Sequence, residues 1–156
     1  KEHLKTKNIE DLEIPLVIAA TNYRDAKIEY LTKGPLIDSL IASSSIPMLF
    51  EITRINGIPY MDGGVMDNMP VDALRDQCKK IIAVYANPQG EMDEIKNPAR
   101  VAERAFHLAI SSEIVRKKKM ADVYIEPPEL QKIGLFDLKQ AKKIFDIGYK
   151  AGKEKL

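Results

Sequence analysis

Apolar residues along the chain form short continuous runs and longer segments with helical spacing. The short runs have the length of strands buried on both faces, and they occupy 14–21, 80–85 and 121–125. Helical spacing predicts three helices, which start near Pro35, Pro98 and Asp137. Strands that alternate with helices are typical of a layered α/β fold.

The apolar stripe of each longer helix indicates the side that packs on the rest of the protein. In the helix from Pro98 the stripe consists of Val101, Ala105, Leu108, Ala109, Ser112 and Val115. In the last helix it consists of Leu138, Ala141, Phe145 and Tyr149. Gln140 follows Asp137 by three positions, as in a capping box. We therefore expect two amphipathic helices, the second of them capped at Asp137.

Two hairpins are predicted in the first half of the chain. One connects the apolar run at 14–21 with the alternating segment at 27–32. The other has Asn56-Gly57 at its tip, the pair preferred in type I′ turns. This second hairpin delivers the chain to Asp62.

The stretch around Asp62 places a carboxylate where a strand must end. Gly63 and Gly64 follow it, and adjacent glycines allow positive φ angles and a close approach of the backbone. Asp-Gly pairs also form ordinary turns. The hairpin before Asp62 and a short helix expected at 70–75 favour a carboxylate presented into a cleft, as a catalytic acid or base.

Composition limits the function classes. The chain has 156 residues, 45% of them hydrophobic, which indicates one globular domain. Its net charge of +1 gives no argument for nucleic-acid binding. Its single cysteine, Cys78, favours a reducing compartment, and we expect a cytoplasmic protein. No apolar run approaches the roughly 18 residues of a membrane span.

Several segments, in order along the chain, resemble the patatin-like phospholipase family. The family's Asp-Gly-Gly with a following Asn-x-Pro is matched by Asp62-Gly63-Gly64 and Asn68-Met69-Pro70. The other similar segments are Glu10–Thr21, Gly34–Leu36, Ala42–Phe50, Ile125–Pro127, Phe136-Asp137 and Gly148-Tyr149. The similarity is collinear through most of the chain, so it is more specific than any single motif.

The resemblance implies a layered α/β/α sandwich with a mixed, mostly parallel sheet. It also implies a hydrolase of phospholipid or other acyl esters that uses a Ser-Asp dyad, and Asp62 matches the position of the aspartate. Gly63 and Gly64 would shape the turn without a chemical role. The resemblance implies no cofactor and no metal, and we expect a bacterial protein.

The chain departs from the family pattern because it contains no Gly-x-Ser-x-Gly elbow and no Gly-rich oxyanion loop. We therefore expect residues 1–156 to be the C-terminal part of one patatin-like catalytic domain. An upstream segment would carry the serine, and the isolated chain would be inactive. The alternative is an inactive fragment or pseudoenzyme that binds lipid or a protein partner.

Other candidate residues have structural interpretations. Ser43, Ser44 and Ser45 precede Ile46-Pro47 without a glycine elbow, which favours helix termination. His3 and His107 do not support a Ser-His-Asp triad. Asp67 and Asn68 fit a turn or cap better than a metal site. The run Arg116–Lys119 fits a solvated helix end, with contact to anionic lipid headgroups as the alternative.

Overall fold

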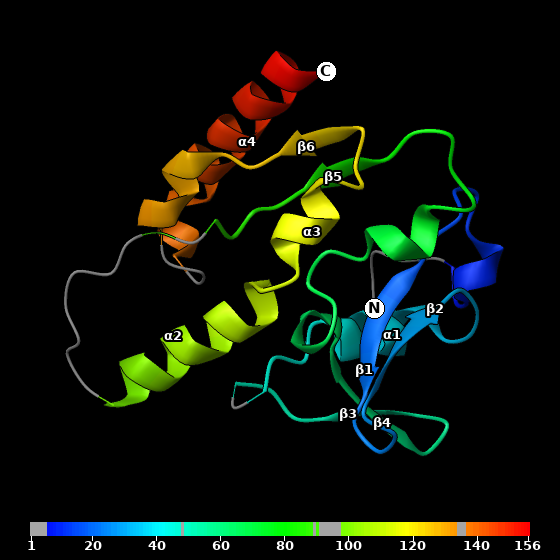
Figure 1. Cartoon of the computed structure of the whole chain (residues 1–156). Helices are drawn as coiled ribbons and strands as arrows, with labels where there is room; N and C mark the ends of the chain where they lie inside the picture. The colour runs from blue at the N-terminus through cyan, green and yellow to red at the C-terminus, as the bar shows by residue number, and fades with distance from the viewer. Residues whose placement is uncertain (1–5, 48, 89, 91–97, 134–136) are drawn as a thin grey trace. The chain divides into compact units, whose positions relative to one another are not determined.

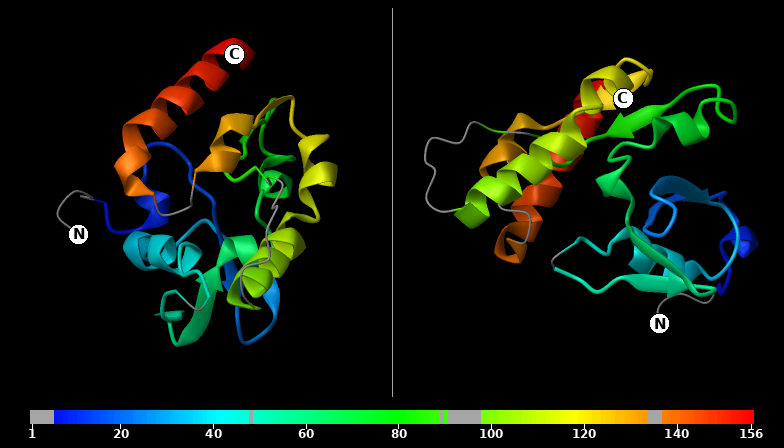
Figure 2. Two further views of the ribbon diagram at one scale, coloured as in Figure 1. Left: turned by 90° about the vertical axis from the view of Figure 1, so that its left-hand side faces the viewer. Right: turned by 60° about the horizontal axis from the view of Figure 1, so that its bottom comes forward.

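A computed structural model of the protein describes residues 6–47, 49–88, 90, 98–133 and 137–156 (Figures 1 and 2). The chain divides into two compact units, Lys1–Ala73 and Leu74–Leu156. The sequence-based expectation that both belong to a single domain stays a prediction.

The first unit is built on a four-stranded antiparallel sheet. Its strands are β1 (Ile18–Asn22), β2 (Lys27–Leu31), β3 (Thr53–Ile55) and β4 (Ile58–Asp62), and their order is β2-β1-β4-β3 (Figure 1). Both predicted hairpins are confirmed, since β1 pairs with β2 and β3 pairs with β4. The central strand β1 contacts β4 with Ala20 opposite Asp62. The topology therefore brings the predicted site residue next to the middle of the sheet.

The turn between β3 and β4 has the geometry that its sequence predicts. Asn56 and Gly57 both have positive φ angles, of 50° and 79°. A type I′ turn requires positive φ at its two central residues, and its twist matches that of the flanking strands. The local sequence thus sets the register that places Asp62 at the end of β4.

One helix, α1 (Leu36–Ser43), packs against this sheet. Its Ala42 joins Ala20, Ile55 and Tyr60 in one apolar cluster, and its Leu36 joins a second cluster. The helix ends where Pro47 predicts. Short 3₁₀ turns lie at Ile9–Asp11, Gly63–Val65 and Val71–Leu74, so the expected helix at 70–75 is only a 3₁₀ turn.

The second unit contains a two-stranded parallel sheet and three α-helices within its described residues. The strands are β5 (Ile82–Val84) and β6 (Val123–Ile125). The helices are α2 (Pro98–Ser111), α3 (Ile114–Lys118) and α4 (Ala141–Lys155), and 3₁₀ turns occupy Pro128–Lys132 and Leu138–Gln140. Figure 2 shows α4 as one continuous helix at the C-terminal end.

The single helix expected over Pro98–Val115 is interrupted. The backbone N–H and the hydroxyl of Ser112 both donate to the carbonyl of Ala109, at 3.3 and 2.8 Å. These local bonds replace the helical hydrogen bond that Ser112 would otherwise make to residue 108. The helix therefore divides into α2 and α3.

The α/β fold class is confirmed, and both pairing directions occur. The expectation of mostly parallel pairing is wrong for the described strands, because β1–β2, β1–β4 and β3–β4 are antiparallel and β5–β6 is parallel. Two of these antiparallel pairs are joined by short hairpin turns, which parallel strands cannot use. The three-layer sandwich remains a prediction.

The apolar stripe predicted for the last helix does not face the core. Leu138, Phe145 and Tyr149 are exposed, whereas Ile144 and Ile147 are partly buried. The predicted capping box is also wrong, since the Gln140 amide donates to the Asp137 carboxylate at 2.6 Å and Asp137 caps no backbone group. Helical spacing alone did not distinguish the two apolar sides of α4.

Two glycine substitutions test the turn before Asp62. A side chain at Gly57 or at Gly148 would meet nothing within 4 Å, but only Gly57 has a positive φ. Gly57→Ala should lower the free energy of unfolding by about 1 kcal/mol. Gly148→Ala, inside α4, should raise it by roughly 0.5–1 kcal/mol. Urea unfolding measures both, and equal effects of the two substitutions would contradict the turn assignment.

Candidate active site

The backbone of Asp62 is held by hydrogen bonds from two elements. Its N–H donates to the carbonyl of Ser45, just after α1, at 3.0 Å. Its carbonyl accepts from the hydroxyl of Thr21 in β1 at 2.9 Å. Helix α1 and strand β1 therefore fix the point at which β4 ends, and the Asp62 side chain projects from a rigid backbone.

The carboxylate of Asp62 caps the 3₁₀ turn that follows β4. One of its oxygens accepts the N–H of Gly64 at 2.7 Å. Burial raises the pKa of this carboxyl, and the Gly64 N–H opposes the rise by stabilising the charged form. A desolvated carboxylate is a stronger base than a solvated one. The site therefore holds the kind of group that can accept a proton from a hydroxyl.

Gly63 and Gly64 are needed for space and not for unusual backbone angles. A Cβ atom at Gly63 would lie 2.3 Å from the carbonyl oxygen of Ala19. A Cβ at Gly64 would lie 2.8 Å from Oδ1 of Asn68 and 3.0 Å from Oδ1 of Asp62. Neither glycine has a positive φ, so the conformational freedom expected from the sequence is not used here. The expected close approach of the backbone is observed.

The loop after Asp62 is fixed by Asp67. The N–H of Asp67 donates to the carbonyl of Gly63 at 2.8 Å, and its carboxylate accepts from the N–H of Met69 at 3.1 Å. The other carboxylate oxygen accepts from the hydroxyl of Tyr30 in β2 at 2.5 Å. Asp67 is 6% exposed. This buried side chain thus ties the loop to the sheet, in agreement with the predicted turn role.

Ser45 has a structural role in the first unit. It is 2% exposed, its hydroxyl donates to the carbonyl of Ile41 at 2.8 Å, and it shares a hydrogen bond with the hydroxyl of Thr53 at 3.0 Å. A buried hydroxyl engaged in this way terminates the helix, as predicted. His3 and the side chain of His107 lie outside the described residues.

The basic run Arg116–Lys119 is largely engaged with the rest of the second unit. Arg116 pairs with Glu113 at 2.7 Å, and Lys117 is buried. Lys118 pairs with Glu126 at 3.5 Å and lies over the ring of Tyr124, 4.4 Å from its centroid. These contacts favour the interpretation of the run as a helix end.

The described part of the chain offers neither a cluster of metal ligands nor a membrane-spanning helix. Among the described residues there is no group of three or more His, Cys, Asp or Glu side chains that could hold a metal ion. None of the helices in this part of the chain is both long and apolar enough to cross a membrane.

Sequence reasoning missed three groups that hold the site. These are the Thr21 hydroxyl, the Ser45 carbonyl and the Tyr30 hydroxyl. Thr21 and Tyr30 carry hydroxyl groups at strand positions where the pattern predicts apolar residues. These hydroxyls were the feature of the sequence that could have indicated buried hydrogen bonds. The role of the Ser45 carbonyl follows only from the fold.

Residues 1–75 match the family model of the patatin-like phospholipases. The match ends just beyond the loop that Asp62 begins. Residues 1–75 belong to the patatin-like phospholipase family. The matched region coincides closely with the first unit, and the Asp-Gly-Gly motif of this patatin-like region is the site described above.

Curated relatives extend the similarity beyond the patatin-like unit. The lysophospholipase nte1 of Neurospora crassa is 26% identical over 94% of this chain, and NTE1 of Kluyveromyces lactis is 26% identical over 92%. NTE1 of Saccharomyces cerevisiae is 25% identical over 93%. The chain spans only 11%, 12% and 10% of the lengths of these relatives. They are fungal, which contradicts the expectation of a bacterial protein.

Gly63→Ala tests the close approach of the backbone in the patatin-like motif. Its Cβ would overlap a backbone carbonyl, which cannot rotate away, so the free energy of unfolding should fall by about 3 kcal/mol. Gly64→Ala should cost less, because the side chains of Asn68 and Asp62 can move. Urea unfolding of the two variants tests this order, and a Gly63→Ala variant as stable as the parent would contradict it.

Asp62→Asn tests the desolvation of the carboxylate. Because burial raises its pKa in the folded state, the folded protein holds this proton more tightly than the unfolded chain. The Asp62 contribution to stability is therefore full below the ordinary aspartate pKa and is lost as pH rises through the raised pKa. The amide of the variant does not titrate. As pH rises from the ordinary aspartate pKa through the raised pKa, the free energy of unfolding of the variant should therefore increase relative to that of the parent.

Unfolding by urea at about pH 3 and at neutral pH measures this difference, since the ordinary aspartate pKa is about 4. Asp76→Asn, a substitution of an exposed aspartate, is the matched control. A parent protein that gains stability relative to Asp62→Asn as pH rises would refute the assignment of a raised pKa.

Proposed function

We propose that this chain supplies the general base of a serine-dependent lipid acyl hydrolase. The observation that supports the proposal is the carboxylate of Asp62, partly desolvated and held at the end of β4 by a fixed backbone. The patatin-like match of residues 1–75 and the lysophospholipase relatives support the same reaction class. Phospholipids and related acyl esters are the proposed substrates.

In the proposed reaction Asp62 moves one proton in each half-reaction. It accepts the proton of a serine hydroxyl while the serine oxygen attacks the ester carbonyl. The proton then passes to the leaving alcohol as the ester bond breaks and an acyl-serine remains. Water attacks the acyl-serine with Asp62 again as base, which releases the fatty acid and restores the serine hydroxyl.

The serine of this dyad is proposed to lie outside the 156 residues. The sequence contains no Gly-x-Ser-x-Gly elbow, Ser43–Ser45 lie at a helix end, and Ser39 is buried within α1. Oxyanion donors would come from the same proposed segment outside the 156 residues. The alternative is a pseudoenzyme that binds lipid or a protein partner, and the absence of the elbow is the observation that favours it.

The test joins this chain to its natural upstream sequence and assays release of fatty acid from a lysophospholipid. Asp62→Asn should lower kcat at least about 100-fold, the loss expected when a general base is removed. Asp76→Asn should leave kcat unchanged. The isolated chain should be inactive.

Three results would contradict the proposal. Activity that survives Asp62→Asn would remove Asp62 from the mechanism. Hydrolysis by the isolated 156 residues would show that no outside serine is needed. An upstream sequence without a serine elbow, together with no hydrolysis by the joined protein, would favour the pseudoenzyme.

A further inference from the structure

Helix α4, the turn before it and the residue after it carry a row of exposed apolar side chains. Leu138, Phe145, Tyr149 and Leu156 are 82%, 68%, 65% and 76% exposed. Within α4, the spacing of four residues places Phe145 and Tyr149 on one side of the helix. The rings of Phe145 and Tyr149 stack with centroids 6.1 Å apart and an angle of 16° between their planes. These four residues are called the exposed α4 face below.

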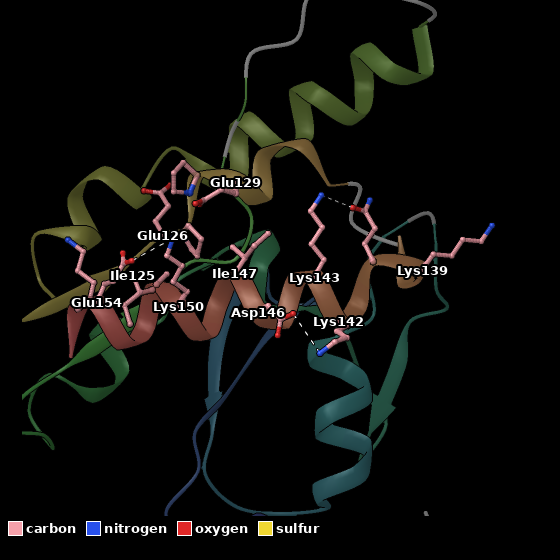
Figure 3. A pocket seen from close by; sticks show the side chains of 15 residues that line it. Ile125, Glu126, Glu129, Lys139, Lys142, Lys143, Asp146, Ile147, Lys150 and Glu154 are labelled. Atoms are coloured by element: carbon pink, nitrogen blue, oxygen red, sulfur yellow. Dashed lines mark hydrogen bonds and ion pairs between the residues drawn. The ribbon is translucent and has the colours of Figure 1, made fainter.

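The opposite side of α4 packs inside the second unit. The helix contacts β6 and the 3₁₀ turn Pro128–Lys132. Together they border a groove of about 870 Å³, which Ile147 and Ala151 help to line (Figure 3). None of the four residues of the exposed α4 face lines this groove. The helix therefore has two apolar sides, and only one of them is used within the described unit.

Lysine side chains border the exposed α4 face. Helix α4 contains five lysines and two acidic residues, a net charge of +3, although the whole chain carries only +1. Lys142 lies three positions before Phe145 and Lys153 four positions after Tyr149, so both border this face. The Lys142 side chain is 91% exposed, and its partner Asp146 is 3.8 Å away. Such an exposed ion pair is weak and leaves the cation available.

This combination fits a lipid surface better than a protein surface. Aromatic residues are common at both kinds of interface, but lysine is depleted at protein–protein interfaces. An interfacial helix instead has aromatic and leucine side chains on one face and lysines on its flanks. Anionic headgroups attract the lysines, and the apolar side chains enter the boundary of the acyl region.

We propose that α4 binds the surface of an anionic lipid bilayer through the exposed α4 face. Phe145 and Tyr149 enter the headgroup boundary, and Lys142 and Lys153 contact the acidic headgroups. The basic run Arg116–Lys119 lies on another helix, α3 and its end, where Arg116 pairs with Glu113, and Lys118 pairs with Glu126 and lies over the ring of Tyr124. The proposal goes beyond the proposed hydrolase function, because surface binding requires neither the serine nor Asp62.

A fluorescence experiment on the 156-residue chain tests where binding occurs. The chain contains no tryptophan, so Tyr149→Trp reports on α4 alone. Vesicles of phosphatidylcholine and phosphatidylserine in equal parts should shift its emission to the blue. Tyr23→Trp, at an exposed position in the first unit, should not shift. No shift for Tyr149→Trp, or an equal shift at both positions, would overturn the proposal.

Sedimentation with the same vesicles tests the chemistry. Lys142→Glu with Lys153→Glu should weaken binding at least about tenfold, since each lysine near an anionic surface contributes about fivefold. Phe145→Ser with Tyr149→Ser should weaken it about tenfold or more. The controls are Lys79→Glu with Lys80→Glu, which makes the same charge change, and the exposed Val115→Ser. Both controls should bind like the parent.

Several results would overturn the assignment. Controls that lose as much binding as the α4 variants would show a general charge effect. Unchanged binding of the α4 variants would exclude this face. A Phe145→Ser, Tyr149→Ser variant that converts a dimer into a monomer without loss of vesicle binding would show that a second copy covers the face. None of these outcomes depends on hydrolytic activity, so they leave the test of Asp62 separate.

Discussion

The backbone of residue 63 lies against the carbonyl of Ala19, and this contact leaves no room for a side chain. Any Cβ there would be 2.3 Å from a backbone oxygen, so the end of β4 can approach the middle of β1 only with glycine at that position. Strand β1 is also the strand that pairs with both β2 and β4. The path of the chain after Asp62 thus depends on the sheet, and not on a locally flexible loop.

The chemistry of Asp62 follows from this path. Its N–H donates to the Ser45 carbonyl and its carbonyl accepts from the Thr21 hydroxyl, so the backbone from which the carboxylate projects is held by α1 and β1. Asp67 fixes the far end of the loop through Met69 and Tyr30. Burial then raises the pKa of Asp62, although the Gly64 N–H opposes it. The pKa of this carboxyl therefore depends on the residues that hold it in place as well as on its being an aspartate.

The sequence predicted those elements whose cause is local. Asn56-Gly57 determines its turn through two positive φ angles, and the turn determines where β4 ends. The site at Asp62 is predictable because an aspartate and two glycines directly follow a predicted hairpin. The interruption at Ser112 was missed because a serine fits a helix unless its local hydrogen bonds compete with the helical ones.

The sidedness of α4 could not be derived from spacing. Phe145 and Ile147 are both apolar, and which of them packs inward depends on β6, a strand distant in sequence. The tie between Tyr30 and Asp67 likewise joins residues 37 positions apart. Long-range partners of this kind set the details of the site, whereas short-range patterns set its location.

The most direct test of the account is the pKa of the Asp62 carboxyl, measured by NMR titration of the chain with labelled aspartate side chains and assigned with Asp62→Asn. The account predicts a pKa above the ordinary aspartate value, because burial outweighs the Gly64 hydrogen bond. A pKa at or below that value would mean a well-solvated or strongly stabilised carboxylate, and it would contradict the central claim that the fold holds Asp62 as a desolvated base.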